Sequence, residues 1–150
     1  MTNILTIRPP KLAAFYFLVT LGLHFLLRPH IIFNFDHRSW GVLTFVLGLT
    51  VMSWAWTLVR NQKTAIRPTE KPSVMIMDGP FEWSRNPMYL GMTLMLWGSA
   101  MFVGTLVMFF APIAFLLTMN AVFVPHEEEM LERAFGEEYL EYQSRVRRWL

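Results

Sequence analysis

From Asn86 to Pro125 the sequence reads NPMYLGMTLMLWGSAMFVGTLVMFFAPIAFLLTMNAVFVP, and none of these 40 residues carries a formal charge. As a single helix this stretch would be roughly 60 Å long at about 1.5 Å per residue, whereas the hydrocarbon core of a bilayer is about 30 Å thick. The stretch is therefore predicted to fold as a hairpin of two membrane spans, at 87–103 and 106–124. The turn is expected within Phe102–Thr105, because Gly104 lies there.

The composition also indicates a membrane protein. Hydrophobic residues make up 54% of the 150 residues and charged residues only 16%, which lies outside the usual range of soluble domains. The charged residues gather in short stretches that leave long uncharged windows between them. The net charge of +2 is small and scattered, which argues against nucleic-acid binding. The chain has no cysteine, so thiolate metal sites and cysteine nucleophiles are excluded.

Two further apolar runs precede the hairpin. Residues 12–27 form an uncharged run of 16 residues with one histidine, His24, and residues 39–59 form a run of 21 residues with no ionisable group. Each run fits one span. No small-residue cleavage site follows Leu27, so the first run is interpreted as a retained span and not as a signal peptide. The predicted fold is all-α, a single membrane domain over residues 1–150 with four transmembrane helices and a helical tail.

The basic residues predict which ends face the cytoplasm. Of the 13 Lys and Arg residues, all but two lie before the first span, between spans two and three, or after span four. The two on the opposite side are Arg28 and Arg38. By the positive-inside rule, both termini and the loop 60–87 are predicted to be cytoplasmic in a multi-pass membrane protein. A water-soluble cofactor would then reach the middle loop and the tail together.

The middle loop ends in a punctuated segment, 79–91, which reads Gly-Pro-Phe-Glu-Trp-Ser-Arg-Asn-Pro-Met-Tyr-Leu-Gly. A proline in the first helical turn and Asn86 at the N-cap place Arg85 just outside a helix N-terminus. Such a terminus favours anionic groups. Gly91, one turn further on, allows a ligand or a neighbouring helix to approach the backbone closely. Taken singly, Arg85 and Tyr89 also fit a snorkelling arginine and an interfacial aromatic belt.

The tail, 126–150, follows the last span and begins with acidic residues. The carboxylates at 127–129 and a glycine nine residues beyond the first of them fit the start and the end of a short helix. The charge pattern alone fits a solvated helix start. Because these carboxylates lie at the same membrane level as Arg85, we also expect them to meet it across the bundle. The single histidine beside them has no partner at ligand spacing, so no metal site is predicted.

The second predicted helix of the tail carries an amphipathic stripe at positions i, i+3, i+7 and i+10. Its members are Tyr139, Tyr142, Val146 and Trp149. We expect this stripe to lie on the membrane surface. Glu141 and Arg145 form an i, i+4 pair on the opposite, wet side.

Two motifs flank the hairpin. The first, in 79–91, reads Gly-Pro-aromatic and then Arg-Asn-Pro-x-Tyr-x-Gly; the second, in 127–146, reads Glu-Glu, then Phe-Gly-Glu-x-Tyr-x-x-Tyr, then Arg-Val. In this order they resemble the isoprenylcysteine carboxyl methyltransferase and phospholipid methyltransferase superfamily of integral-membrane enzymes, over residues 67–150. The eukaryotic carboxyl methyltransferases usually have histidine where this chain has Asn86, and proline where it has Arg147. The chain instead resembles the short bacterial members.

The resemblance implies that S-adenosylmethionine binds at the cytoplasmic ends of spans three and four, under the tail. The implied cofactor-binding residues are Arg85, Asn86, Tyr89, Gly91, Glu127, Glu128, Tyr139 and Tyr142. The implied catalytic residues are Arg85, Glu128 and Arg145. Arginine would bind the carboxylate of the cofactor and the glutamates its hydroxyl or amino groups. A carboxylate acceptor would be oriented by Arg145 or Arg85, whereas an amine acceptor would need a base, for which Glu128 is the candidate.

The implied reaction is methyl transfer to a lipophilic small molecule or lipid, most like isoprenylcysteine-type carboxyl O-methylation. Phospholipid or other small-lipid N-methylation is the alternative. A four-span transporter or adaptor is the alternative from another class, although the spans contain no ionisable residue except His24. The related sterol reductases, which use NADPH, are a second enzymatic alternative. They have more spans, which argues against this alternative. No Gly-x-Gly-x-x-Gly sequence is present, which excludes a Rossmann-type methyltransferase.

Overall fold

The computed structural model describes residues 7–27, 30, 36–62 and 74–150. Within these ranges the chain is helical and contains no β-strand. The elements in chain order are α1 (Pro9–Leu27), α2 (His37–Asn61), the 3-10 helix η2 (Gly79–Glu82), α3 (Pro87–Val103), the 3-10 helix η3 (Leu106–Phe109), α4 (Phe110–Thr118), the π-helix η4 (Met119–Phe123), α5 (Val124–Phe135) and α6 (Glu137–Arg145).

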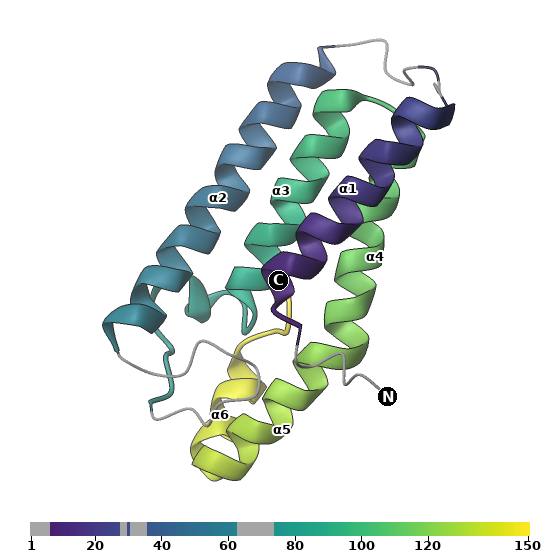
Figure 1. The fold of residues 1–150 in the computed structure, drawn as a ribbon. Helices are drawn as coiled ribbons and strands as arrows, with labels where there is room; N and C mark the ends of the chain where they lie inside the picture. Colours follow the sequence, from purple (N-terminus) through teal and green to yellow (C-terminus); the bar gives the residue numbers. More distant parts are fainter. Residues whose placement is uncertain (1–6, 28–29, 31–35, 63–73) are drawn as a thin grey trace.

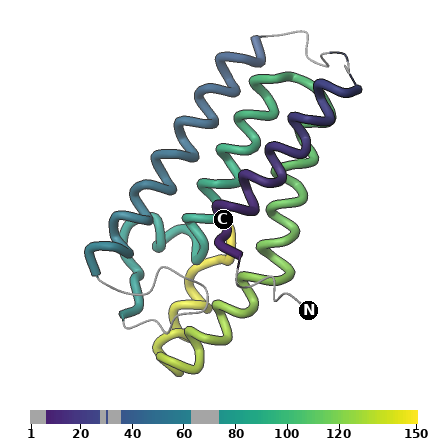
Figure 2. The backbone as a smooth tube through the Cα atoms, viewed as in Figure 1, coloured from purple at the N-terminus to yellow at the C-terminus, as the bar shows by residue number. Residues whose placement is uncertain are grey.

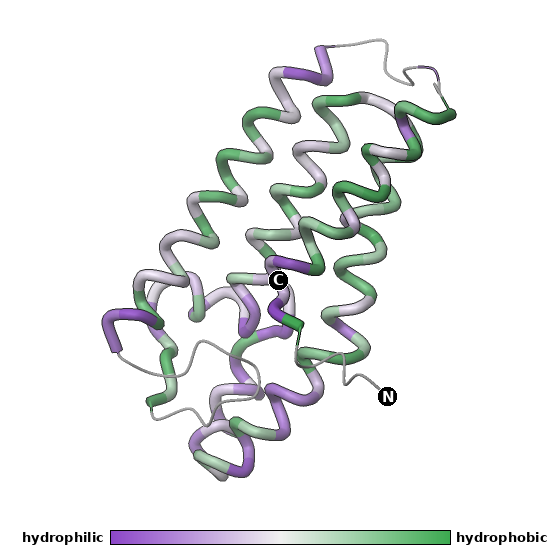
Figure 3. The backbone as a smooth tube through the Cα atoms, in the orientation of Figure 1, coloured by the Kyte–Doolittle hydropathy of each residue, from purple (hydrophilic) through white to green (hydrophobic). Residues whose placement is uncertain are grey.

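The helices form an elongated bundle. Figure 1 shows α1, α2, α3 and α4 running side by side, with α5 and α6 extending beyond one end. Hydrophobic residues line the bundle, and hydrophilic residues concentrate in α5, α6 and the neighbouring segments (Figure 3). This distribution separates an apolar part, suited to lipid, from a polar end.

Three helical segments are long and apolar enough to span a membrane. They are α1, α2 and the continuous helix from Leu106 to Phe135 that comprises η3, α4, η4 and α5. The fourth apolar helix, α3, has 17 residues, which is the lower end of the range of about 17–25 that spans a bilayer. The expected hairpin turn is confirmed: α3 ends at Val103, and its C-cap is Gly104, whose φ of +78° is left-handed.

The last long helix continues through Pro125, beyond residue 124 where the fourth span was predicted to end. The α-helical hydrogen-bond ladder cannot continue unchanged there, because proline lacks its N–H. Instead, the N–H of Val124 donates to the carbonyl of Met119, five residues back, in a π-turn. This wider turn accommodates the proline, and the helix changes direction there (Figure 2).

Glycines bring α2 and α3 into close contact. Gly41 on α2 faces Gly98 on α3, and Gly48 faces Gly91. Within each helix the two glycines are seven residues apart, which is two helical turns. A Cβ on Gly91 would lie 2.7 Å from the carbonyl oxygen of Gly48, so no side chain fits there. Gly91 thus admits a neighbouring helix, the second of the two roles considered for it.

Within the described residues, two hydrogen bonds join helix α1 to the rest of the bundle, in addition to its apolar packing. The hydroxyls of Tyr16 and Thr118 are 2.8 Å apart, and Nδ1 of His24 lies 3.1 Å from Oγ1 of Thr105. Hydrogen bonds of this kind hold helices together in lipid, where the hydrophobic effect gives no preference for one helix contact over another. His24 therefore has a structural partner.

Candidate functional site

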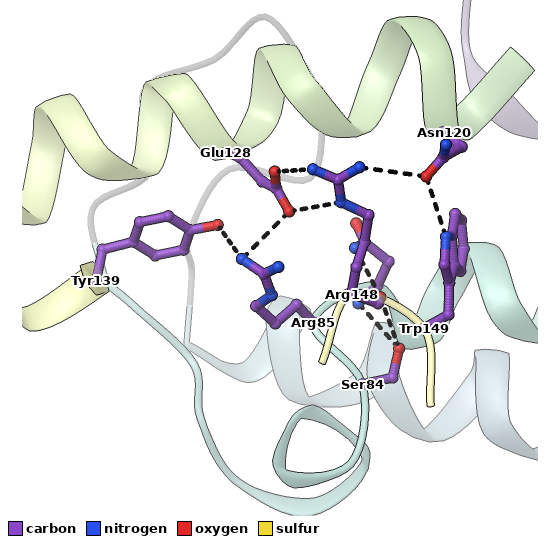
Figure 4. A network of polar contacts seen from close by, with 8 residues as sticks. Ser84, Arg85, Asn120, Glu128, Tyr139, Arg148 and Trp149 are labelled. Atoms are coloured by element: carbon purple, nitrogen blue, oxygen red, sulfur yellow. Dashed lines mark hydrogen bonds and ion pairs between the residues drawn. The ribbon is translucent and has the colours of Figure 1, made fainter. Parts of the chain in front are cut away.

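The polar side chains converge at the end of the bundle where α3 begins (Figure 4). Four segments meet there: the N-terminus of α3, the first turns of α5, helix α6, and the last five residues, 146–150, which we call the strap. The strap starts where Val146 adopts an extended conformation, with φ −115° and ψ 131°, and so ends α6.

The first motif folds as η2 and is fixed from two sides. Gly79 adopts a φ of +62°, and a Cβ there would lie 3.1 Å from the ring of Trp54 on α2. From the other side, the hydroxyl of Tyr142 on α6 donates to the carbonyl of Phe81 at 2.7 Å. The Gly-Pro-aromatic sequence thus connects α2 with α6 directly before the charged residues.

The strap is held by backbone contacts to the residues before α3. The backbone N–H of Arg85 donates to the carbonyl of Arg147 at 2.9 Å. The hydroxyl of Ser84 and the side-chain amide of Asn86 both donate to the carbonyl of Arg148, at 3.2 Å and 3.0 Å. Asn86 occupies the expected N-cap position of α3, but its side chain makes no capping bond because it is used to hold the strap.

The centre of the site is one carboxylate between two guanidinium groups. Nη1 of Arg85 lies 3.2 Å from Oε1 of Glu128 and also donates to the hydroxyl of Tyr139 at 3.3 Å. Arg148 donates to the same carboxylate through Nε at 3.1 Å and Nη2 at 2.6 Å, a bidentate arrangement. The side chains of Arg85 and Glu128 are only 10% and 13% exposed. These charges are therefore largely withdrawn from water and interact strongly.

The described part of this cluster contains a buried donor without a hydrogen-bond partner. Both side-chain contacts of Arg85 are made through Nη1. Among the residues that the structure describes, its Nε–H is buried and has no hydrogen-bond partner. A buried donor without a partner costs free energy, and a bound ligand would supply one.

A second polar contact lies next to this charged cluster. The hydroxyl of Tyr89, on the first turn of α3, donates to Oε1 of Glu127 on α5. Tyr89 is buried and belongs to the hydrophobic core cluster of the bundle. The pair therefore joins the polar site to the apolar core.

The tyrosines of α6 pack against the protein. The prediction that their stripe lies on the membrane surface is therefore wrong. Tyr139 and Tyr142 are buried, with ring centroids 6.3 Å apart. Burial raises the pKa of both phenols above the ordinary value, so they remain neutral hydroxyls. The stripe also ends early, because α6 stops at Arg145.

The structure brings together most of the residues that the resemblance implied. Those in or against the cluster are Arg85, Asn86, Tyr89, Glu127, Glu128, Tyr139 and Tyr142. Gly91 instead contacts α2. Arg145 is 63% exposed and pairs with Glu141 at 3.4 Å, as its i, i+4 spacing predicted. In the described part of the chain, no group of three or more His, Cys, Asp or Glu side chains is placed to hold a metal.

Sequence reasoning missed two side chains that complete the cluster, Arg148 and Asn120. Nη1 of Arg148 and Nε1 of Trp149 both donate to Oδ1 of Asn120, at 3.3 Å and 3.2 Å. The signal for Asn120 was its amide within an otherwise apolar run, just before the acidic residues. Arg148 is one of four arginines in the tail, and nothing in their order distinguishes it.

The sequence is similar to a known protein family. A family model described as phospholipid methyltransferase matches residues 37–138, which include α2 to α5 and the paired glutamates. An uncharacterised protein of Haemophilus influenzae is 38% identical over 63 residues, which are 42% of this chain and the whole of that protein. No solved structure matches. Because the family model covers more than half of the chain, this membrane protein belongs to the phospholipid methyltransferase family.

Proposed function

We propose that this chain transfers a methyl group from S-adenosylmethionine to a lipophilic acceptor at the cytoplasmic face of a bacterial inner membrane. In this proposal α3 is a fourth membrane span, both termini are cytoplasmic, and residues 1–150 form one domain. Family membership supports methyl transfer. A buried polar cluster at one end of an apolar bundle supports a site that receives a water-soluble donor and a membrane-embedded acceptor.

The observation that carries the proposal is the buried, unpartnered Nε–H of Arg85. A carboxylate bound there would form a charge-assisted hydrogen bond. The N-terminus of α3, which begins at Pro87, favours the same charge through its free amides. The cofactor has one carboxylate. It also has an amino group and ribose hydroxyls, which can donate hydrogen bonds to Glu127 and Glu128. The residues present therefore fit this group.

When bound, S-adenosylmethionine supplies an electrophilic methyl group: its S–CH3 bond breaks as the bond to the acceptor forms, and S-adenosylhomocysteine leaves. Such a displacement needs no covalent nucleophile, so the residues of the site contribute by positioning and by excluding water. An amine acceptor also releases a proton. Both oxygens of Glu128 already accept from Arg148, whereas Glu127 accepts a hydroxyl from Tyr89. Glu127 is therefore the better placed carboxylate to take that proton.

Two acceptors fall within the proposal, and they make different demands on the site. An isoprenylcysteine-type carboxylate needs a cation to orient it. Arg145 is exposed and paired with Glu141, so this role passes to Arg85. A phospholipid amine, which the description of the matching family suggests, needs a base, and this role belongs to Glu127.

Calorimetric titration of S-adenosylmethionine and NADPH into the detergent-purified chain tests the donor. We expect saturable binding of the first and none of the second. Glu128→Gln should weaken binding by about tenfold or more, because the carboxylate is largely buried among charged donors. Glu129→Gln is the matched control, since this next carboxylate along α5 is exposed and pairs with Arg133; its effect should stay below about twofold.

A wild-type chain that does not bind S-adenosylmethionine would refute the proposal and favour the transporter or adaptor. Binding that survives both Glu128→Gln and Arg85→Ala unchanged would refute the site. Transfer of a labelled methyl group to bacterial lipid extract or to a prenylcysteine analogue then identifies the acceptor. At saturating cofactor, Glu127→Gln should slow amine methylation by about 100-fold and leave carboxyl methylation largely intact, because a carboxylate acceptor releases no proton.

A further inference from the structure

The strap lies outside the residues that match the family model, yet it completes the charged cluster. Its carbonyls at 147 and 148 accept from the segment before α3, as described above. Its side chains reach across to α5 and to the π-turn. The strap is therefore bound on two sides, between the N-terminus of α3 and the last long helix.

Arg148 determines how Glu128 is oriented. It donates to both carboxylate oxygens, Oε1 and Oε2, whereas Arg85 contacts Oε1 alone. A bidentate guanidinium fixes the plane of a carboxylate, which a single contact does not. The strong hydrogen bond to Glu128 also raises the pKa of Arg148 above its ordinary value, so the charge is permanent. With Arg148 removed, Glu128 would keep one cationic contact and could rotate.

Asn120 fixes Arg148 in turn. Its Oδ1 accepts from Nη1 of Arg148 and from Nε1 of Trp149, so one amide oxygen holds two consecutive strap residues. Trp149 also packs against the hydrophobic core cluster that contains Tyr89. The position of Arg148 is thus set by contacts on both sides of its guanidinium, and is not that of a freely rotating surface arginine.

We propose that Arg148 is a positioning residue of the cofactor site, which acts through Glu128 and is held in place by Asn120 and Trp149. The role rests on the proposed function above. Arg148 itself contacts the carboxylate and not the ligand; it keeps Glu128, and through it Arg85, in the arrangement that the ligand meets. In the opposite role, Arg148 would occupy the position of a cationic group of the ligand. It would then compete with the ligand and weaken its binding.

Calorimetric titration of S-adenosylmethionine into single and double variants of the full chain separates these roles. Arg148→Ala should raise Kd about tenfold or more, and Arg148→Lys should restore part of the loss, since lysine keeps the charge without the bidentate geometry. Arg133→Ala is the control, because it removes one positive charge from α5 at a 75% exposed position; its Kd should change less than about twofold. In a Glu128→Gln background, Arg148→Ala should cause no further loss.

Three results would overturn the role of Arg148. Unchanged binding of S-adenosylmethionine by Arg148→Ala would show that Arg148 does not position the site. Tighter binding would show that Arg148 competes with the ligand. Losses that simply add in the double variant would show that Arg148 does not act through Glu128. Circular dichroism of each variant without ligand verifies that the helices are retained. Trp149→Phe removes one bond to Asn120 but leaves Arg148 in place, so it should raise Kd by a smaller factor than Arg148→Ala does. Absence of binding by the wild type would refute the proposed function itself.

Discussion

Replacing Gly48 by alanine should destabilise the bundle, because α2 and α3 approach too closely there to admit a methyl group. A Cβ at this position would lie 2.6 Å from the carbonyl oxygen of Gly91 and 2.7 Å from the backbone nitrogen of Met95. Ordinary contacts begin at 3.4 Å, so the two helices would have to separate by about 0.8 Å. Both obstructing atoms belong to the backbone, so no side-chain rotation relieves the clash.

The matched control is Gly22→Ala on α1, where a Cβ would meet nothing within 4 Å. Both variants gain the same difference in helix propensity, so their comparison isolates the cost of the clash. Gly48→Ala should unfold with a free energy about 1–3 kcal/mol below that of Gly22→Ala, which is the usual cost of overpacking. Reversible unfolding by sodium dodecyl sulfate in mixed micelles, followed by circular dichroism, measures this difference.

The same substitution should affect the site, because α3 carries Tyr89 in its first turn and Gly91, which contacts Gly48, only two residues later. Separation of α2 from α3 would displace Tyr89 relative to Glu127, so we expect weaker S-adenosylmethionine binding by Gly48→Ala and normal binding by Gly22→Ala. Equal unfolding free energies for the two variants would refute the reasoning, since the close approach of the backbones would then not exist in the folded protein.

Two hydroxyl deletions test the contacts on either side of the site. Tyr89→Phe leaves Glu127 without its phenolic donor, so the free energy of unfolding should fall by about 1–3 kcal/mol in the same micelle assay; a chain as stable as the wild type would show that this carboxylate does not depend on Tyr89. Tyr142→Phe removes the bond to the carbonyl of Phe81, which should cost about 1 kcal/mol and speed hydrogen exchange in η2. Unchanged exchange there would mean that α6 does not hold the first motif.

The course of the hairpin could be predicted because it depends on local rules. An uncharged run twice as long as a bilayer is thick must turn, and Gly104 is the residue that tolerates the left-handed conformation of that turn. The helix boundary at Pro125 could not be predicted in the same way. A proline is consistent with either a helix start or a kink, and the π-turn that accommodates it lies where Met119 and Phe123 are buried in the core.

The paired glutamates and Arg85 could be assigned to one site because span counting placed both on one side of the membrane and the motif order supported a shared ligand. The tyrosines of α6 show the limit of this reasoning. Periodicity correctly indicated that Tyr139 and Tyr142 share a face, but it does not identify what covers that face. The covering surface is η2 and Arg85, which lie more than 50 residues earlier in the chain.

The same limit explains why Arg145 was chosen over Arg148. Arg145 belongs to the Arg-Val part of the second motif, whereas Arg148 lies beyond that motif. In the structure Arg145 is exposed and pairs with Glu141 on the surface of α6. Arg148 has no acidic partner at helical spacing in the sequence, and in the structure it turns inward to Glu128 because the extended strap pairs with the backbone of Arg85. That backbone pairing joins residues more than 60 positions apart, so it could not be predicted from local spacing.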